Sequence, residues 1–429
     1  MIWATATIGE LCEKTAQRDP SLLPDDQFKY VDISSLDKDW KLIVRPAEML
    51  GRDAPSRARK EIKAGDVLVS TVRPNLNAVA IVPDELDGEI ASTGFCVLRP
   101  KRSLVNSRYC FYWTLTEAFI NHLVSRARGA SYPAVTDDVV FSCAVPLPPL
   151  SEQMRIVEIL DQAQELRQER NKADVLSTHV LSALFVKMFG DPGSWGTSQD
   201  AHPLRSFVSI ASGGTPDTKN SGYWGGDIPW VSAKDMKRRT ITDTGDHITE
   251  LAVDQQNLKL INPGAVLIVV RGMILARKIP LALAGVRLTI NQDLKALILT
   301  DSKLTPDFLH TALEIQAPTL LTKVGTAAHG TRRIETEDLL NIPILPPQPR
   351  TVAHFQTMAD QIQHISAEGS EATLHLDSLF KTLLQKAFSG ELSARWRDFH
   401  MKELLAEMEK QSRTLEAISS DRLVSVENG

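Results

Sequence analysis

Two long stretches of the chain carry apolar residues at helical spacing, and each follows a proline-rich segment. The first begins near Ser151, where Ser-Glu-Gln after two prolines is a typical helix start, and ends at Phe189. The second runs from about Arg350 to Phe388, and Gly369 softens its middle. Apolar positions recur about every seven residues, at Ile156, Ile159, Ala163, Leu166, Ala173, Val180 and Leu184 in the first stretch and at Val352, Phe355, Ala359, Ile362, Leu376, Leu379 and Leu383 in the second. This rhythm favours a coiled coil over the alternative, a single long helix packed on its own domain.

Short apolar runs separated by Pro and Gly precede each long helix and predict β-strands. In the first half these runs are FKYVDIS, GDVLVSTV, NAVAIVP and ASTGFCVLRP. A helical run, SRYCFYWTLTEAFINHLVSR, follows them, and the period of its aromatic residues predicts a core face. The second half repeats this order: residues 228–239 resemble residues 28–39, and residues 263–274 resemble residues 64–75. Arg73 and Arg271 are predicted to take equivalent places. The same mixed α/β module is therefore predicted twice.

The repeat predicts an α+β chain of five parts. Two similar globular domains span residues 1–147 and 193–345, and each leads into a long helical spacer, at residues 148–192 and 346–392. The remaining residues, 393–429, are predicted to form a charged amphipathic helix with a disordered end.

Composition describes an ordinary water-soluble chain. Its 429 residues, 43% of them hydrophobic, can supply cores for roughly two to four domains. The net charge of −5 argues against indiscriminate coating of nucleic acid, although a sum over the whole chain hides local basic faces. No stretch resembles a signal peptide or a spanning helix, which predicts a cytoplasmic protein without membrane association. Four cysteines, Cys12, Cys96, Cys110 and Cys143, lack C-x-x-C spacing and are predicted to be buried thiols.

Catalytic signatures are missing from the sequence. It has no G-x-x-x-x-G-K-[ST] phosphate loop, no G-x-G-x-x-G after a strand, no H-E-x-x-H and no G-x-S-x-G. It also lacks the Asn or Asp followed by Pro-Pro and an aromatic residue that amino-methyltransferases use to hold a target base. We therefore predict no catalytic residue, no cofactor-binding residue and no metal ligand in this chain.

Recognition of DNA fits the residues that remain. Two repeated modules with cationic and aromatic loops suit a duplex whose phosphates are regularly spaced and whose groove edges carry a donor and acceptor code. The predicted DNA-contacting residues are Arg73, Asn75, Arg128, Ser131 and Tyr132 in the first module and Lys219, Tyr223, Lys234, Lys237, Arg238, Arg271, His329 and Arg332 in the second. For each of these residues a solvated surface position is the competing interpretation, and for Trp224 and Trp230 it is a place in the core.

Three motifs carry a resemblance to a known family. They are SGGTPDTKNSGYWGGDIPWVSAKDMK at the start of the second module, PLPPLSEQMRIVEILD at the head of the first spacer, and LLQKAFSGELSARWR after the second. With these motifs and the repeat, essentially the whole chain resembles the specificity subunit of a Type I restriction-modification system. It departs from that pattern at PPQPRTVAHF, where an acidic-Gln-Arg run is usual, and at the FGD that ends the first spacer.

This resemblance implies two target recognition domains, each reading one half of a split double-stranded DNA sequence. The two spacer helices would pack antiparallel as a ruler for the gap between the halves. Two methyltransferase subunits would be direct partners, and restriction or translocase subunits would join through them. S-adenosylmethionine, ATP and magnesium would then be held by those partners, and this chain would be a non-catalytic DNA-specificity subunit.

Two other functions stay open. A coiled-coil adaptor that assembles protein subunits without reading DNA would share the helices and the lack of catalytic motifs. Such a complex would be indifferent to DNA sequence, and exchange of one globular domain would not change its target. A nuclease or methyltransferase in its own right would instead show activity in the purified chain.

Overall fold

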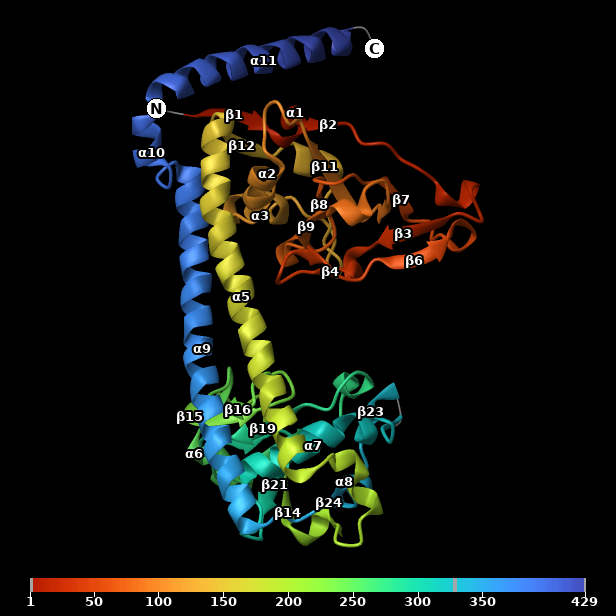
Figure 1. Cartoon of the computed structure of the whole chain (residues 1–429), viewed down its shortest axis with the longest axis vertical. Coiled ribbons are helices and arrows are strands. Elements are labelled where there is room, and N and C mark those ends of the chain that lie inside the picture. The colour runs from red at the N-terminus through yellow and green to blue at the C-terminus, as the bar shows by residue number, and fades with distance from the viewer. Residues whose placement is uncertain (1–2, 327–329, 428–429) are drawn as a thin grey trace. The chain divides into compact units, whose positions relative to one another are not determined.

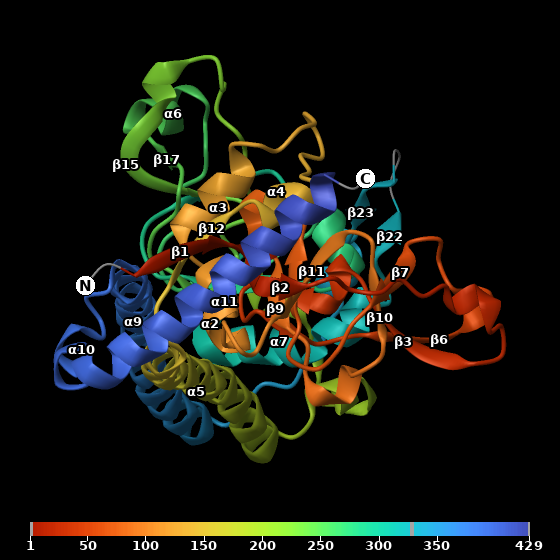
Figure 2. The same cartoon turned by 90° about the horizontal axis from the view of Figure 1, so that it is seen from above.

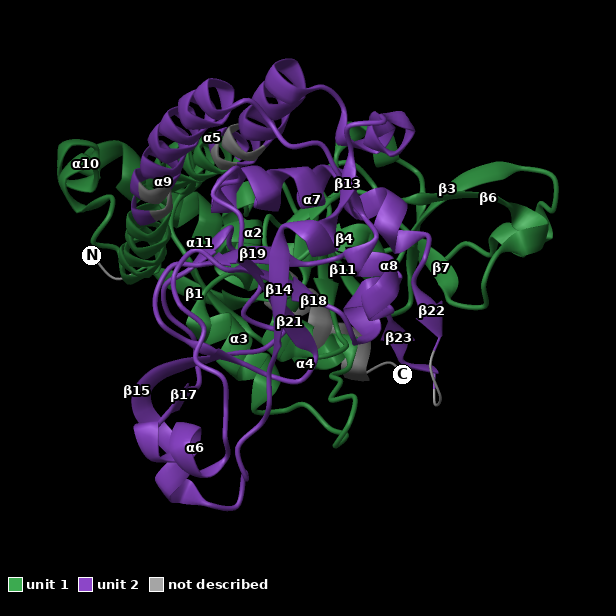
Figure 3. Ribbon diagram, turned by 90° about the horizontal axis from the view of Figure 1, so that it is seen from below, with its two compact units in different colours: residues 1–171, 372–429 green, residues 172–371 purple. Residues whose placement is uncertain are grey.

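The computed structural model describes the backbone of residues 3–326 and 330–427, and the chain divides into two compact units (Figure 1, Figure 3). Unit 1 comprises residues 1–171 and 372–429, and unit 2 comprises residues 172–371. Each unit therefore contains one globular module and parts of both long helices.

Unit 1 holds the first module, which contains two four-stranded sheets with strand orders β6-β3-β10-β7 and β2-β11-β8-β9. Its strands are β1 (Ala4–Thr7), β2 (Cys12–Glu13), β3 (Gln27–Val31), β4 (Leu36–Asp37), β5 (Leu42–Ile43), β6 (Ala47–Leu50), β7 (Ala58–Glu61), β8 (Val67–Ser70), β9 (Val79–Ile81), β10 (Ile90–Ser92), β11 (Phe95–Pro100) and β12 (Ala144–Leu147). Its short helices are α1 (Ile8–Leu11), α2 (Ser107–Thr114), α3 (Glu117–Val124) and α4 (Asp137–Phe141). Tyr109 and Tyr112 of α2 are fully buried, which confirms the predicted core face.

Unit 2 holds the second module, which contains a five-stranded sheet, β14-β21-β18-β19-β16, and a three-stranded sheet, β17-β15-β20. Its strands are β13 (His202–Pro203), β14 (Val208–Ser212), β15 (Trp224–Val231), β16 (Thr240–Ile241), β17 (His247–Ile248), β18 (Val266–Val269), β19 (Leu281–Ala284), β20 (Thr289–Ile290), β21 (Leu294–Leu299), β22 (Gly325–Thr326), β23 (Arg332–Arg333) and β24 (Pro343–Ile344). Its short helices are α6 (Glu250–Gln255), α7 (Pro306–Leu321) and α8 (Thr336–Leu340). In Figure 3, β15, β17 and α6 form a lobe at one edge of this unit.

The two modules are structural repeats. β8 lies between β9 and β11, and β18 lies between β19 and β21, with all four pairings antiparallel. The register also agrees, because Val69 lies opposite Cys96 in unit 1 and Ile268 lies opposite Lys295 in unit 2. The central strands, VLVS and VLIV, are almost entirely apolar and are buried on both faces, as expected for strands inside a core. The predicted repetition of one module is confirmed.

The predicted long helices are present as α5 (Leu150–Phe189) and α9 (Pro349–Ser389), and α9 continues through Gly369. In unit 1, Arg167 of α5 pairs with Asp377 of α9 at 2.6 Å, and Ile156 shares a core with Ala387. An earlier residue of α5 therefore lies beside a later residue of α9, so the two helix segments run antiparallel.

Unit 2 shows the same antiparallel arrangement at the other ends of these helices. The rings of Phe185 and Phe189 of α5 lie 5.3 Å and 5.4 Å from the ring of Phe355, near the start of α9. Phe308 of α7 packs on both phenylalanines of α5, at 5.0 Å and 4.9 Å. The helix pair is therefore part of each module's core rather than a separate element.

The predicted seven-residue seam is only partly correct. Leu166, Val180 and Leu379 are 57%, 51% and 49% exposed, whereas Leu160 and Leu181 are buried. The reason is that each long helix packs against its module as well as against the other long helix. The buried face of the helix is therefore set by both contacts and does not keep a strict seven-residue repeat.

The C-terminal segment folds onto unit 1 as α10 (Ala394–Phe399) and α11 (Met401–Glu427), which confirms the predicted additional helix (Figure 2). Glu152, near the start of α5, is fully buried and accepts hydrogen bonds from Trp3 Nε1 at 3.0 Å, Ser393 Oγ at 2.7 Å and Arg397 Nε at 2.7 Å. Gln411 of α11 donates to the Pro148 carbonyl at 3.2 Å. Hydrogen bonds and an ion pair thus hold α10 and α11 against the N-terminal end of α5.

All four cysteines are free and buried, as predicted. Across residues 3–326 and 330–427, no helix is long and apolar enough to cross a membrane. The same residues contain no group of three or more His, Cys, Asp or Glu side chains placed to hold a metal ion.

Candidate nucleic-acid interface

Two loops are joined along the edge of the first module, one after β8 and one before α4. The Arg73 N–H donates to the Pro133 carbonyl at 2.7 Å, and the Val135 N–H donates to the Thr71 carbonyl at 2.9 Å. The second loop is closed on itself, because Arg128 and Ala134 exchange two backbone hydrogen bonds of 2.9 Å. These bonds hold the loops in one defined arrangement.

The side chains on these joined loops are exposed and include an aromatic and cationic pair. The Arg73 guanidinium lies 4.5 Å from the centre of the Tyr132 ring, and Tyr132 is 69% exposed. Asn75, Arg128 and Ser131 are also exposed. The structure therefore brings the five residues predicted in the first module onto two adjoining loops. An arginine stacked on a tyrosine is held in place while its N–H groups stay available.

A lysine from a neighbouring hairpin supports the Arg73 loop. Lys41 Nζ donates to the Asn77 carbonyl at 2.5 Å, and Asn77 adopts a left-handed conformation with φ of 44°. Burial lowers the pKa of Lys41 from 10.5 to about 8. Lys41 thus acts on the loop by positioning its backbone.

The second module joins its loops by the same backbone bonds. The Gly272 N–H donates to the Arg332 carbonyl at 3.0 Å, and the Ile334 N–H donates to the Val270 carbonyl at 2.9 Å. Gly272 and Arg73 hold corresponding places and both have positive φ, 131° and 50°.

This correspondence corrects the predicted equivalence of Arg73 and Arg271, which is wrong by one residue. Arg271 forms a β-bridge with Arg333, just as Val72 forms one with Ala134. Arg271 is therefore the counterpart of Val72, and the counterpart of Arg73 is a glycine.

Cations gather around the joined loops of the second module. Arg271 is exposed, and Arg332 Nη1 donates to Thr326 Oγ1 at 3.0 Å. Arg333, which follows the predicted Arg332 in the same cationic loop, is exposed here too, and residues that the sequence interpretation missed are Arg277, Lys278 and Lys295. Lys295 gave no signal because it stands in an otherwise apolar strand, far from these loops in sequence. The predicted His329 lies outside the described residues.

A second cationic group in this module surrounds a surface hollow. Lys234, Lys237 and Arg238 line it together with residues 240–245, and all three cations are exposed. Lys234 pairs with Asp246 at 2.5 Å. The structure thus brings these three predicted residues together, with one of them partly neutralised.

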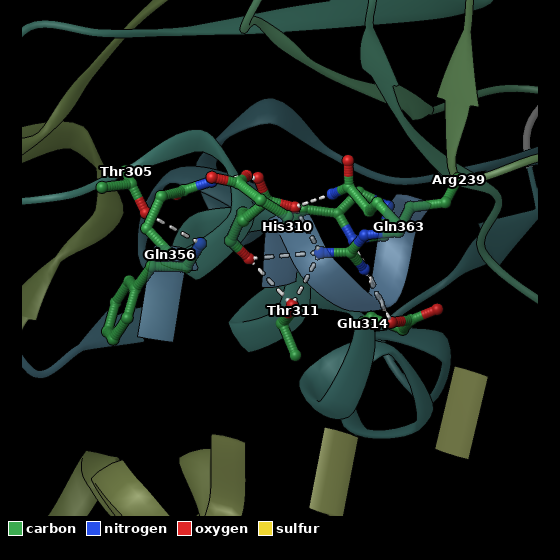
Figure 4. Close-up of polar contacts among 10 residues, drawn as sticks. Arg239, Thr305, His310, Thr311, Glu314, Gln356 and Gln363 are labelled. Carbon is green, nitrogen blue, oxygen red and sulfur yellow. Dashed lines mark hydrogen bonds and ion pairs between the residues drawn. The ribbon is translucent and has the colours of Figure 1, made fainter. Parts of the chain in front are cut away.

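Arg239 leaves this surface and enters a polar network inside unit 2 (Figure 4). Its Nη2 donates to Asp307 Oδ1 at 3.0 Å and to Thr311 Oγ1 at 2.9 Å, and its Nη1 donates to His310 Nδ1 at 2.8 Å. His310 is 1% exposed, and burial, followed by the Arg239 charge, holds the pKa of its imidazole well below the ordinary value. The neutral ring can therefore accept the Arg239 hydrogen bond.

The Asp307 carboxylate extends this network from α7 to α9. It accepts from Gln356 Nε2 at 2.8 Å and also from Gln363 Nε2. Arg239 thus joins the strand region beside Arg238 to α7, and Asp307 joins α7 to the long helix. This arrangement gives Arg239 a structural role and removes it from the cationic surface.

The burial of Tyr223 corrects the prediction that this side chain contacts DNA. Tyr223 is 7% exposed in a small core with Ile228 and Ile248, and its hydroxyl donates to Gln255 at 2.9 Å. The core takes the ring because the Gly-rich segment before β15 folds back over the three-stranded sheet. Lys219, in the same segment, is exposed.

The two tryptophans of this segment are half-buried and pack against the small core around Tyr223, so the competing interpretation of a core position is only partly correct. Their rings lie 5.3 Å apart at an angle of 83°. Trp224 Nε1 donates to the Asp217 carbonyl at 3.2 Å, and Trp230 Nε1 donates to the Gly214 carbonyl at 3.0 Å. These bonds fix the Gly-rich loop that carries Lys219.

Comparison with known proteins gives consistent matches over the whole repeat. The family model described as the Type I restriction modification DNA specificity domain matches residues 2–175 and 201–369. The specificity subunit of the Type I restriction enzyme HindI from Haemophilus influenzae is 19% identical, over 80% of this chain and 89% of that protein. The MjaIX specificity subunit from Methanocaldococcus jannaschii is 21% identical, over 86% of this chain and 97% of that protein.

A solved structure gives the same assignment. Its subject is complex assembly and conformational transition of the type I R-M system, and one of its chains is 31% identical to this one. The match has a TM-score of 0.52 and covers 91% of this chain and 98% of that chain. The duplicated family domain and this relative together show that the chain belongs to the family of Type I restriction-modification DNA specificity subunits.

Proposed function

We propose that this chain binds a two-part DNA target and directs the other subunits of a Type I restriction-modification complex to it. The observation that carries the proposal is the pair of joined loops that occurs once in each module and presents exposed cations in both. Exposed arginine and lysine side chains are the groups that contact phosphates and base edges in DNA. Two such surfaces in one chain suit a target with two halves.

The chemistry of methylation and cleavage is proposed to reside in partner subunits. Two methyltransferase subunits would bind this chain directly, and restriction or translocase subunits would join through them. S-adenosylmethionine, ATP and magnesium would belong to these partners, and this chain would act without catalysis of its own. The relative from a type I R-M assembly supports a role inside a multisubunit complex.

Genome-wide mapping of modified bases tests this function. The chain is co-expressed with its cognate methyltransferase in a host that lacks DNA methylation. We expect modification at one two-part motif with a fixed unspecified gap, and exchange of the module at residues 193–345 should change only one half of it. A stable, methylation-competent complex that modifies DNA without such a motif would instead favour the adaptor function.

The Arg73 loop provides a sharper test within the first module. We expect Arg73→Ala to weaken binding of the assembled complex to its target by about 1–3 kcal/mol, the range for loss of a good base contact. Tyr132→Ala should weaken binding in the same direction, because the ring orients the guanidinium. Equilibrium binding to matched and half-mutated duplexes measures both effects.

The control for this test is Arg52→Ala, which removes an exposed arginine of the same unit that pairs with Asp25 at 3.1 Å. This variant should bind like the unchanged chain. Equal losses for Arg52→Ala and Arg73→Ala would mean that the Arg73 loop has no special place in the interface.

A further inference from the structure

We propose that Arg271, Lys295 and Arg333 form a phosphate-binding site that the second module has and the first module lacks. The proposal rests on the DNA-binding function above and assigns to this site the DNA backbone rather than the bases. It implies that the second module binds its half of the target with a phosphate contact that the first module does not make.

The backbone brings the three cations together from separate parts of unit 2. Arg271 and Arg333 are paired across a β-bridge between the joined loops. Lys295 lies on β21, opposite Ile268 of β18, the strand that leads into Arg271. The sheet register therefore places all three at the same edge of the module.

The charges of this group are poorly compensated by the protein itself. Lys295 Nζ donates to Ser212 Oγ at 2.6 Å, and among the described residues no ion pair joins Lys295 or Arg271 to a carboxylate. Arg333 pairs at 3.2 Å with Glu335, whose side chain is 61% exposed and can exchange this contact for another anion.

The three cations repel one another, which helps to lower the pKa of the lysine. The pKa of Lys295 is lowered first by partial burial and then by the charges of Arg271 and Arg333. A bound anion would relieve this repulsion, because it would interact favourably with all three cations at once.

The first module shows that the repeated fold does not require these charges. The residues at the three corresponding positions are Val72, Cys96 and Ala134, as the shared bridge and strand register define. All three are uncharged, and Cys96 is fully buried in the core. The fold thus tolerates neutral side chains at this edge. At each of the three positions the second module has a cation where the first module has an uncharged residue.

Three cations at one edge suit contact with one phosphate or two adjacent phosphates. Arginine and lysine contact phosphate oxygens without reading sequence, and such contacts fix the position of a protein along the duplex. We infer that the second module gains affinity from the backbone at this edge. The first module presents the Arg73 and Tyr132 pair on its corresponding loops instead.

The test replaces the three cations in the assembled complex by Arg271→Val, Lys295→Met and Arg333→Ala. Binding to a target duplex is measured between about 50 and 200 mM salt, at constant pH. We expect the slope of log K against log salt to become shallower by about 1 to 2, or about 0.9 for each lost phosphate contact. Near 0.15 M salt this corresponds to binding that is about 5- to 30-fold weaker.

A matched control removes the same charge from the same unit. Arg205→Ala, Arg287→Ala and Lys303→Ala delete three exposed cations that each pair with a carboxylate. This variant should keep the slope of the unchanged complex. Equal slope changes in both variants, or an unchanged slope in the first, would overturn the site.

Thermal melting separates a folding defect from loss of a site and identifies the anion. The neutral variant should melt at or above the temperature of the unchanged chain, because repulsion is removed. Inorganic phosphate, added at constant ionic strength, should compete with DNA only weakly. Strong stabilisation of the unchanged chain by free phosphate, with no effect of the substitutions on the salt slope, would show a free-anion site and refute the DNA assignment.

Genome-wide mapping of modified bases distinguishes a failure of the phosphate site from a failure of the proposed function. Absence of a two-part motif would refute the proposed function. Presence of the motif together with an unchanged salt slope in the neutral variant would refute only the phosphate site.

Discussion

Replacement of Glu152 by alanine is expected to lower the stability of unit 1 by about 3–5 kcal/mol, the range for breaking a buried ion pair. Glu152 is fully buried, and its carboxylate joins Trp3, Ser393 and Arg397. Its loss leaves the Arg397 guanidinium, whose side chain is only 12% exposed, without its anion. Unfolding in denaturant, with hydrogen exchange in peptides of unit 1, measures the effect separately from unit 2.

Two further variants test whether the charge of Glu152 is the cause. Glu152→Gln keeps an acceptor oxygen and the side-chain shape, so its cost should be smaller than that of the alanine variant. Glu158→Ala removes an exposed glutamate of the same helix, which pairs with Arg155, and should change stability by less than about 1 kcal/mol. A loss below 1 kcal/mol for Glu152→Ala would show that the C-terminal helices are not held by this carboxylate.

Asp307→Ala is expected to destabilise unit 2 by a similar amount, about 3–5 kcal/mol. The Asp307 side chain is 8% exposed and accepts hydrogen bonds from Arg239 of the module and from two glutamines of α9. Removal of the carboxylate takes away the closest anion of the Arg239 guanidinium, which keeps Glu314 at 3.5 Å, and one acceptor from each of two glutamine amides. Thermal or denaturant unfolding followed by hydrogen exchange in α7 and α9 reports this loss.

A second substitution distinguishes loss of the network from simple loss of packing. Arg239→Met, combined with Asp307→Leu, replaces both charged partners by apolar side chains and should recover much of the stability. The matched single change is Asp301→Ala, which removes a surface aspartate before α7 and should have little effect. A double variant no more stable than Asp307→Ala would mean that the Arg239 charge is not the source of the cost.

Local pattern predicted the repeat, the long helices and the loops that carry the candidate interface. These features were accessible because strand runs, proline-rich helix starts and Arg-rich loops are local in sequence. The exposure of Leu166 and Val180 was not, because it depends on which neighbours each helix face meets after folding. The burial of Tyr223 likewise depends on a loop that folds back over a sheet.

The predicted register of the two modules was also wrong by one residue. Arg73 and Arg271 are both arginines that follow a buried strand, which suggests equivalent positions. The backbone shows otherwise, because the residues with positive φ at this point are Arg73 and Gly272. The cationic site was out of reach for a related reason: Arg271, Lys295 and Arg333 are far apart in sequence, and only the strand register brings them to one edge.

The way Glu152 is bonded also sets the order in which the chain can fold during its synthesis. Unit 2 is one continuous segment, whereas unit 1 is assembled from both ends of the chain. Glu152 cannot pair with Arg397 until the ribosome has added a further 245 residues, and at ordinary rates of translation this synthesis takes roughly 10–50 s. The module that leaves the ribosome first is therefore completed last, and for that interval its buried carboxylate site stays open to water and to chaperones.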